Sequence, residues 1–224
     1  MKYWLATLLL YALPLHALQL GDAAPDFEAE TTVGHVHFER WRQDHWVVMF
    51  SHPASFTPVC TTELAAVERL NSAFEQRNVR ALALAVSPLN DLKEWLDDID
   101  ESQGVRPSFP IISDQNRTIS TRYGMLHPRS NNLTTVRSVF IIDPRGRIRL
   151  KMDYPPSIGR NFDELIRAID ALQTTYRYPV LTPADWKPGD DAIISPKLSD
   201  DDAKTLFPAQ KEATLPYLKY TPLP

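Results

Sequence analysis

The stretch SHPASFTPVCTTE, residues 51–63, decides how this sequence is interpreted, because it holds Cys60, the only cysteine of the chain. Directly before it, the run HWVVMF (45–50) is rich in β-branched and aromatic residues, which predicts a buried strand. After it, apolar residues recur at helical spacing between Leu64 and Phe74, which predicts a helix of several turns. The cysteine therefore lies where a strand passes through a tight proline-containing loop into a helix.

The beginning of that helix favours a reactive thiol. Thr57 occupies the position of a helix N-cap, and Pro58 is then the first helical residue, where its missing N–H costs nothing. This counting puts Cys60 in the first turn, where the helix dipole and the free N–H groups favour a negative charge. The thiolate is the nucleophilic form of cysteine. A lone cysteine is often only a small buried apolar residue, but strand, proline loop and capped helix together favour catalysis.

Strands and helices alternate through the rest of the first 176 residues. The sequence predicts strands at 79–88, 109–113, 138–142 and 148–152, and helices at 89–100, 117–124 and 161–175. The segment DPRG (143–146) is typical of the turn of a β-hairpin. Alternation with one antiparallel hairpin predicts an α/β fold, a mixed sheet covered by helices.

The composition changes after about residue 176, where prolines and aromatic residues become dense. We predict a small C-terminal extension at 177–224, with a short helix at 199–207 capped by Ser199. Several of its apolar side chains are expected to pack on the body of the protein or on a second copy. These are Leu198, Leu206, Phe207, Tyr217, Leu218 and Tyr220.

The N-terminal segment 1–17 has the pattern of a secretory signal peptide. Lys2 supplies a positive start, and the apolar run from Tyr3 to Leu13 is followed by Pro14. This pattern predicts export to the periplasm or the extracellular space. The alternative is an uncleaved membrane anchor, because the apolar segment approaches the length of a bilayer span.

The bulk composition excludes several functions. A formal net charge of -4 without a basic cluster gives no electrostatic footprint for nucleic acid. The histidines look scattered and no cysteine pair exists, so we predict no metal site and no cofactor. One cysteine also excludes an intramolecular disulfide, so any redox chemistry needs a thiol from another molecule.

At this point the residues carry a resemblance to a known family. The segment PASFTPVC fits the peroxiredoxin pattern P-x-x-x-T-x-x-C at Pro53, Thr57 and Cys60, and its surroundings resemble the one-cysteine, peroxiredoxin-six type. The resemblance extends over essentially all of the chain from Leu18 to Pro224. Further matching segments are LQLGDAAPDFEAETTVGHVHF (18–38), YPPSIGRNFDELIRAIDALQ (154–173), DWKPGDDAIISP (185–196) and YLKYTPLP (217–224).

The resemblance implies a fold, an activity and partners. It implies a thioredoxin-like peroxidase domain at 18–176, followed by a dimerisation extension at 177–224 and hence a homodimer. The implied reaction reduces hydrogen peroxide and organic hydroperoxides through a sulfenic acid on Cys60, as antioxidant defence. An external thiol, either glutathione or a thioredoxin-like or glutaredoxin-like protein, would restore the cysteine.

The resemblance also implies the residues of the site. Thr57 would hydrogen-bond to the peroxide, and Arg137 would stabilise both the thiolate and the transition state. The supporting residues lie around them and shield, orient or add donors. They are Pro53 as a shield, Glu63 as the partner of Arg137, His52 beside the pocket, Arg160 as a second arginine, and Val59 through its backbone N–H.

One departure from the family pattern concerns a second activity. The mammalian members of the family that this chain resembles carry a second activity, a phospholipase with a set of serine, histidine and aspartate. The matching positions here hold His45, Glu39 and Arg145, so no serine-based phospholipase activity is expected. Lipid hydrolysis that disappears on removing one serine would contradict this expectation.

Two other classes of function stay open from the residues alone. A cysteine hydrolase would need a histidine base and a third group to orient it. A non-enzymatic binding protein, such as a holdase-like oligomer or a redox-sensing partner, would retain its function without Cys60. Assays with peroxide, with peptide and with a Cys60→Ser variant separate the three.

Overall fold

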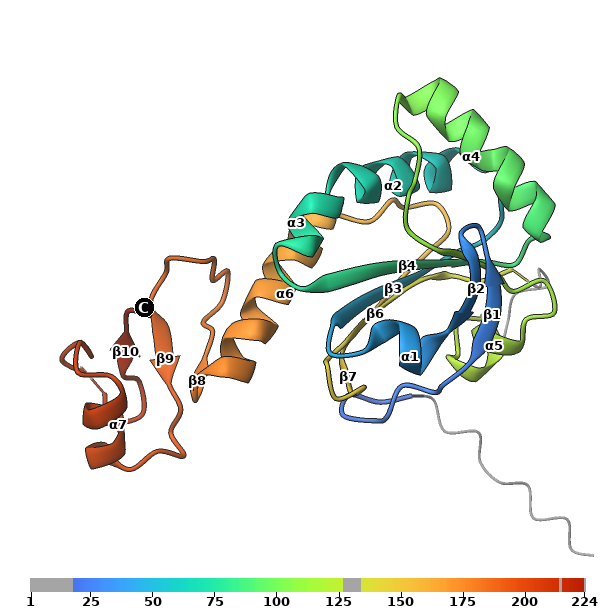
Figure 1. Ribbon diagram of the computed structural model, residues 1–224. Coiled ribbons are helices and arrows are strands. Elements are labelled where there is room, and N and C mark those ends of the chain that lie inside the picture. Colours follow the sequence, from blue (N-terminus) through green and yellow to red (C-terminus); the bar gives the residue numbers. More distant parts are fainter. Residues whose placement is uncertain (1–17, 127–133, 214, 224) are drawn as a thin grey trace, which may run out of the picture.

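A seven-stranded mixed sheet forms the body of the computed structural model, which describes residues 18–126, 134–213 and 215–223 (Figure 1). The expected signal peptide, 1–17, lies outside the described residues. The strand order is β2-β1-β5-β4-β3-β6-β7. The strands are β1 (Glu28–Thr31), β2 (Gly34–His37), β3 (Trp46–His52), β4 (Val79–Ala85), β5 (Ile111–Ser113), β6 (Arg137–Ile142) and β7 (Ile148–Tyr154).

Helices cover both faces of this sheet. The central strand β3 pairs in parallel with β4 and antiparallel with β6, and every residue of β3 is buried. Alternate β3 side chains point to two separate cores, which lie on opposite faces of the sheet. The helices are α1 (Phe38–Arg42), α2 (Pro58–Arg69), α3 (Asn71–Glu75), α4 (Leu89–Gln103), α5 (Thr118–Arg122) and α6 (Phe162–Arg177).

The two cores divide the helices between the faces. One core contains Trp46, Val48 and Phe50 of β3 with side chains of α2, α3, α4 and α6. The other contains Val47 and Met49 with side chains of α1 and α5 (Figure 1). The expected mixed sheet covered by helices is therefore confirmed.

Several element boundaries differ from the sequence expectation for local reasons. The strand expected at 79–88 ends at Ala85, and Pro88 then stands at the N-cap position of α4. The helix expected at 89–100 continues to Gln103 and stops at Gly104, which adopts the left-handed conformation that glycine tolerates best. The expected long helix after Cys60 divides into α2 and α3 at Leu70.

The sequence analysis missed the hairpin β1–β2 and the short helix α1. The hairpin pairs Glu28 with His37 and Glu30 with His35, and it forms one edge of the sheet. Each strand has only four residues; β1 alternates between exposed and buried residues, whereas β2 buries only Val36. Such short edge strands carry too few apolar residues to be recognised from periodicity alone.

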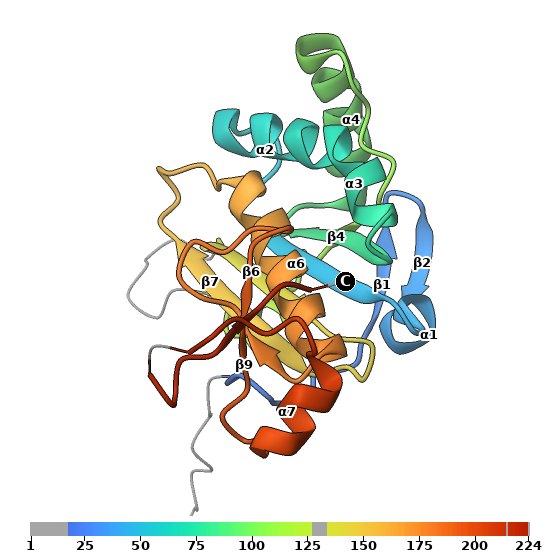
Figure 2. The same ribbon diagram turned by 90° about the vertical axis from the view of Figure 1, so that its left-hand side faces the viewer.

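The extension after α6 is a separate small layer. It contains β8 (Val180–Leu181), β9 (Ala192–Ile194), α7 (Asp200–Leu206) and β10 (Tyr220–Thr221), and its sheet has the order β10-β9-β8. Figure 1 shows it beyond the end of α6, apart from the main sheet, and Figure 2 shows it from that end, in front of the body. The expected cap of α7 is confirmed, because the Ser199 side chain accepts a hydrogen bond from the Asp202 N–H (3.1 Å).

The extension buries only part of its apolar surface. Phe207 lies in a small core of its own with Val180, Ile194 and Ala203, and Leu198 packs against this core. Leu218 and Tyr220 are half-buried. The side chains of Leu206 and Tyr217 remain 54% and 69% exposed. The single chain therefore leaves an apolar surface on the extension.

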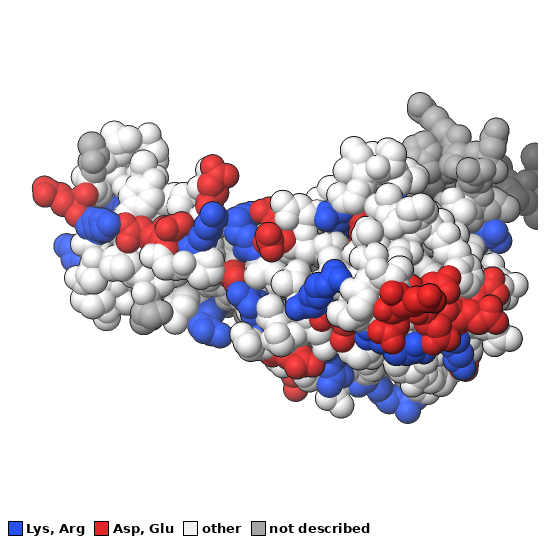
Figure 3. Space-filling model, turned by 90° about the horizontal axis from the view of Figure 1, so that it is seen from above, with Lys and Arg blue, Asp and Glu red and all other residues white. Residues whose placement is uncertain are grey.

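Acidic side chains gather over α4 on the face shown in Figure 3. The exposed acids of that helix are Glu94, Asp97, Asp98, Asp100 and Glu101.

Within the described part of the chain, no helix is both long enough and apolar enough to cross a membrane.

Candidate active site

The loop between β3 and α2 places Cys60 in the first turn of a helix. Thr57 has the extended backbone of an N-cap residue, and Pro58 is the first helical residue, as expected. The Thr57 side chain does not cap the helix, because its hydroxyl donates to the Ala54 carbonyl oxygen instead (3.1 Å). Phe56 adopts a left-handed backbone (φ 54°), which is strained for an aromatic residue and turns the chain into the helix.

The first turn of α2 leaves backbone donors free of the helix ladder. The first bond of the ladder runs from the Thr61 N–H to the Thr57 carbonyl oxygen (3.0 Å). The N–H groups of Val59 and Cys60 precede it, so the helix itself does not use them. These two N–H groups and the helix dipole favour negative charge beside the Cys60 sulfur. Pro53 is half-buried in the loop before the helix.

Arg137, the first residue of β6, contacts the cysteine directly. Its Nη1 lies 3.1 Å from the Cys60 Sγ and 2.8 Å from the Glu63 Oε2. Its Nε and Nη2 donate to the Pro156 carbonyl oxygen, at 3.0 Å and 2.8 Å. The guanidinium is almost completely buried. Four hydrogen bonds thus fix a positive charge against the thiol.

Glu63, one helical turn after Cys60, links two buried arginines. Its Oε2 accepts from Arg137 (2.8 Å) and from the Arg160 Nη2 (2.7 Å). Its Oε1 accepts from the backbone N–H and the Nε of Arg160, at 2.8 Å and 3.0 Å. A buried carboxylate is stable only when it is paired and hydrogen-bonded, and here both oxygens are satisfied.

Arg160 bonds to the backbone of both β3 and β6. Its Nη1 donates to the carbonyl oxygens of Ser51 and Ser138, both at 3.1 Å. Its guanidinium carbon lies 5.4 Å from the centre of the Phe50 ring, a cation–π contact. Burial lowers the pKa of Arg160 from its usual value, and the Glu63 carboxylate opposes this shift. Arginine stays protonated in proteins, so the group remains a cation.

His52, the last residue of β3, is fully buried beside this cluster. Its Nδ1 lies 3.4 Å from the Arg160 Nη2 and 3.5 Å from the Glu63 Oε2. Burial, and then the positive charges of Arg160 and Arg137, hold the pKa of His52 well below its usual 6.5. The imidazole is therefore neutral, and its contact with Glu63 is not an ion pair. Among the described residues, nothing hydrogen-bonds to its Nε2.

The cluster beside Cys60 carries an unequal number of positive and negative charges. Arg137 and Arg160 bring two positive charges into the protein interior, and Glu63 supplies one negative charge. With a neutral thiol and a neutral His52, one positive charge is left over. A Cys60 thiolate cancels it. Buried charges need partners, so a negative charge at the sulfur would complete the pairing of the cluster.

The same charges exclude a cation at this point. His52, Cys60 and Glu63 have donor atoms within 4.8 Å of one another, a spacing that a metal ion could use. However, both guanidinium groups already bind the Glu63 carboxylate at 2.7–2.8 Å. A divalent cation would face two buried positive charges. The geometry fits anionic chemistry rather than a metal.

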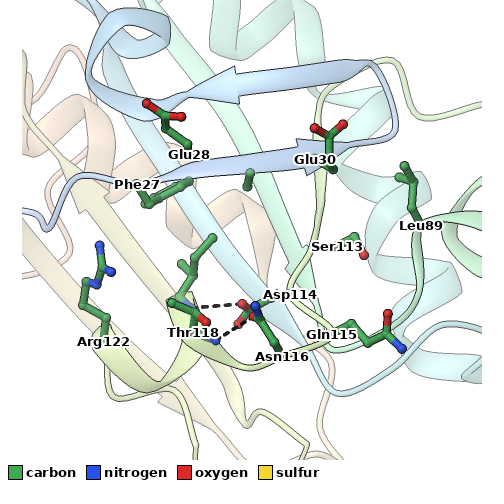
Figure 4. Close-up of a pocket in the computed structure, with 12 residues that line it drawn as sticks. Phe27, Glu28, Glu30, Leu89, Ser113, Asp114, Gln115, Asn116, Thr118 and Arg122 are labelled. Atoms are coloured by element: carbon green, nitrogen blue, oxygen red, sulfur yellow. Dashed lines mark hydrogen bonds between the residues drawn. The ribbon is translucent and has the colours of Figure 1, made fainter.

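Two of the hollows on the described surface differ in their relation to the cysteine-bearing helix. One, of about 550 Å³, borders the beginning of α2 and is lined by Phe56, Thr57, Pro58, Thr61 and Trp95 with three polar residues of α4. The other, of about 750 Å³, lies between β1 and the loop after β5 (Figure 4). None of the site residues expected from the sequence lines the second hollow. Of these two, the first borders the cysteine-bearing helix and the second does not.

The sequence analysis missed the acceptors that fix both arginines. The acceptors are the backbone carbonyls of Pro156, Ser51 and Ser138. A backbone carbonyl belongs to every residue type, so it leaves no trace in a motif. The Ser51 hydroxyl adds a further link, because it donates to the Val136 carbonyl oxygen (2.6 Å) and accepts from the Ser138 N–H (3.0 Å). These bonds join β3 to β6 behind the site.

Comparison with known proteins assigns this geometry to a family. The AhpC/TSA family profile matches residues 20–151, more than half of the chain. The chain belongs to the AhpC/TSA family of peroxiredoxins. A second profile, the C-terminal domain of 1-Cys peroxiredoxin, matches residues 171–210.

Relatives agree with this assignment. A 1-Cys peroxiredoxin of Dictyostelium discoideum is 47% identical over 207 residues, covering 92% of this chain and 86% of the relative. Peroxiredoxin-6 of Rattus norvegicus is 42% identical over 220 residues, covering 92% and 98%. The solved structure of peroxiredoxin 6 from Arenicola marina has a TM-score of 0.87 at 42% identity, covering 93% of this chain and 99% of that one.

A yeast structure completes the comparison. The yeast mitochondrial 1-Cys peroxiredoxin has a TM-score of 0.87 at 44% identity, covering 92% of this chain and all of the other. The expected resemblance and the thioredoxin-like peroxiredoxin fold are confirmed. The protein is a thiol-dependent peroxidase of the one-cysteine type.

The neutral, buried state of His52 predicts a specific dependence of stability on pH. Below pH 6.5 the unfolded chain protonates this histidine while the folded chain does not, so the free energy of unfolding falls as the pH falls. One such proton contributes at most about 1.4 kcal/mol per pH unit. Chemical denaturation between pH 5 and 7 is expected to give a shallower slope for His52→Gln than for the unmodified protein. Equal slopes would show that His52 takes up its proton in the folded state.

Proposed function

We propose that Cys60 is the peroxidatic cysteine and that the protein reduces hydrogen peroxide and organic hydroperoxides. The observation that carries the proposal is the 3.1 Å contact between the Arg137 Nη1 and the Cys60 Sγ inside a buried, charge-paired cluster. A fixed guanidinium at this distance stabilises a thiolate and any negative charge that forms next to it.

The reaction balances with the groups at hand. The Cys60 thiolate attacks one peroxide oxygen, the O–O bond breaks, and its electron pair passes to the leaving oxygen. That oxygen takes up a proton and departs as water or an alcohol, and Cys60 is left as a sulfenic acid. Arg137, the N–H groups of Val59 and Cys60, and the Thr57 hydroxyl are the donors proposed for the developing charge.

The remaining residues are proposed to position these donors. Glu63 fixes Arg137 and Arg160 through four hydrogen bonds. Pro53, in the loop before Thr57, shields the thiolate from water. His52 fills the space behind the cluster as a neutral ring, so its proposed role is packing and orientation rather than proton transfer.

Removing the positive charge at Arg137 tests this assignment. We expect Arg137→Gln to lower the second-order rate of peroxide reduction by about 100-fold or more, the usual effect of losing one donor to a developing oxyanion. Cys60→Ser is expected to abolish the reaction. Stopped-flow measurement with reduced protein, followed by mass spectrometry of Cys60, measures both effects.

A matched arginine provides the control. Arg149 is half-buried and pairs with Asp143 (3.1 Å) on the neighbouring strand β7, away from the cluster. Arg149→Gln is therefore expected to keep the full rate. A rate for Arg137→Gln equal to that of Arg149→Gln, or a reduced protein that reacts no faster than a free thiol, would contradict the assignment.

An external thiol is proposed to restore the enzyme, because the chain has no second cysteine. The similar yeast 1-Cys peroxiredoxin is described as resolving its thiol via glutathione/thioredoxin systems. A thiol would attack the sulfenic acid, release water and form a mixed disulfide, and a second thiol would reduce that disulfide. Glutathione and a thioredoxin-like or glutaredoxin-like protein are both compatible with this sequence of steps.

A trapping experiment distinguishes these reductants. Protein oxidised by one equivalent of peroxide is mixed with glutathione, or with a thioredoxin lacking its second cysteine, and Cys60 is analysed by mass spectrometry. A mixed disulfide is expected with at least one of them, together with peroxide turnover when that system is complete. If neither forms an adduct and neither supports turnover, the proposed class of reductant is wrong.

A homodimer through the C-terminal extension is proposed from its uncovered apolar side chains. Leu206 and Tyr217 are 54% and 69% exposed, although the same layer has a small buried core around Phe207. A double variant, Leu206→Asp with Tyr217→Asp, should shift the sedimentation coefficient to that of a monomer. Leu20→Asp, which alters an exposed leucine (66%) outside the extension, is the control and should leave it unchanged.

Export through segment 1–17 is the proposed localisation. Its support is the signal-peptide pattern, together with the family match, which begins only at residue 20. Expression of the full sequence in a bacterial host should yield periplasmic or secreted protein that begins near Leu18, and Leu8→Arg should block this. Full-length protein held in the membrane fraction would instead support the anchor.

A further inference from the structure

Two histidines and two glutamates meet on the exposed face of the hairpin β1–β2. Glu28 and Glu30 are two residues apart on β1, and His35 and His37 are two residues apart on β2. Because side chains alternate along a strand, each pair projects from one face. The register places Glu28 opposite His37 and Glu30 opposite His35. The hairpin thus gathers four possible metal ligands that the sequence analysis regarded as scattered.

The distances within this group suit a metal ion. The His37 Nδ1 lies 2.7 Å from the Glu28 Oε1, and the His35 Nε2 lies 3.6 Å from the Glu28 Oε2. One donor atom each from Glu28, His35 and His37 lies within 4.8 Å of the others. Tetrahedral ligands at ~2.1 Å from zinc are about 3.4 Å apart. Small rotations of these exposed side chains would bring them to that spacing.

Glu30 contacts one of the proposed ligands, His35, on the side away from Glu28. Its Oε1 lies 2.7 Å from the His35 Nδ1. A carboxylate that holds one ring nitrogen of a histidine fixes the tautomer and leaves the other nitrogen free to bind a metal. The free nitrogen here is the Nε2 of His35, which is the one that faces Glu28. Glu30 therefore fits the role of an outer partner rather than a ligand.

From these contacts we propose that Glu28, His35 and His37 bind one divalent transition-metal ion, with Glu30 orienting His35. Imidazole with carboxylate suits Zn²⁺ or Cu²⁺, whereas Mg²⁺ and Ca²⁺ require oxygen ligands. Three protein ligands leave one position for water or another molecule.

The hairpin around the proposed ligands has a well-fixed backbone, and its charges suit a divalent cation. Ala29 and Val36, which alternate with the proposed ligands, are buried on the opposite face. The turn between the strands is fixed by the Thr31 hydroxyl, which donates to the Gly34 carbonyl oxygen (2.6 Å). Two carboxylates balance a divalent charge.

One neighbouring cation must be accommodated. The Arg40 Nη2 lies 3.3 Å from the His37 Nδ1, and the Arg40 side chain would turn away when the metal binds.

The proposed site lies at the surface of the protein. Figure 4 shows Glu28 and Glu30 projecting from the same strand at the border of the larger hollow. Glu28 and His35 are exposed, so the ion would be accessible from solvent.

Metal titration of the intact chain tests the site. Chelator-treated protein is titrated with Zn²⁺ by calorimetry, and a Cys60→Ser background is titrated with Cu²⁺ to avoid thiol oxidation. One ion per chain is expected, and the electron paramagnetic resonance spectrum of the Cu²⁺ form should show coupling to two imidazole nitrogens. His35→Gln and His37→Gln should each weaken binding more than 10-fold, and Glu30→Gln by about 10-fold or more.

Matched variants decide the location of the ion. Glu39→Gln removes an exposed carboxylate of α1 that has no contact with His35 and should keep the affinity unchanged. Circular dichroism verifies that each variant is folded. The proposal is overturned if the unmodified protein binds neither ion, if both histidine variants retain its affinity, or if Zn²⁺ binding is lost in Cys60→Ser.

Discussion

The carboxylate of Glu63 holds two buried arginines in place, and the arrangement around Cys60 depends on it. Both of its oxygens are used, and its partners Arg137 and Arg160 come from distant parts of the chain. Removing one partner of such a pair leaves an uncompensated buried charge, which typically costs about 3–5 kcal/mol. The cluster therefore links stability to chemistry. The ion pair with Glu63 holds Arg137 against the thiol, and the same ion pair compensates the charge of Arg137 inside the protein.

Sheet topology explains how these residues meet. β3 and β6 are far apart in sequence but adjacent in the sheet, so the loop after β3 and the beginning of β6 lie side by side. Arg160 then enters from the segment before α6 and bonds to carbonyls of both strands. The loop turns at Phe56, whose left-handed backbone stores strain next to the nucleophile. An antiparallel pair of strands thus supplies the arginine, and a helix beginning supplies the sulfur.

Much of this site could be predicted because it rests on side chains with distinctive chemistry. Thr57, Pro58 and Cys60 follow the local rules of helix beginnings, and Arg137, Glu63 and Arg160 followed from the family resemblance. The carbonyl acceptors could not be predicted, since backbone groups are the same in every residue. The hairpin β1–β2 and the two- and three-residue strands of the extension were missed for a different reason. They are too short, and too polar or proline-rich, for periodicity to reveal them. The proximity of His35 and His37 to two glutamates was missed with them, because it follows from the pairing register of the hairpin.

The charge balance around Cys60 changes with each turnover. The thiolate neutralises the pair of arginines and the glutamate, but its oxidation to an uncharged sulfenic acid removes that neutralising charge. The oxidised enzyme then holds an unmatched positive charge at the same place. An incoming thiolate carries the charge that is missing, whereas a neutral thiol does not. The buried arginine pair therefore stabilises an anion at two stages. Before oxidation the anion is the Cys60 thiolate, and after oxidation it is the incoming thiolate of the reductant.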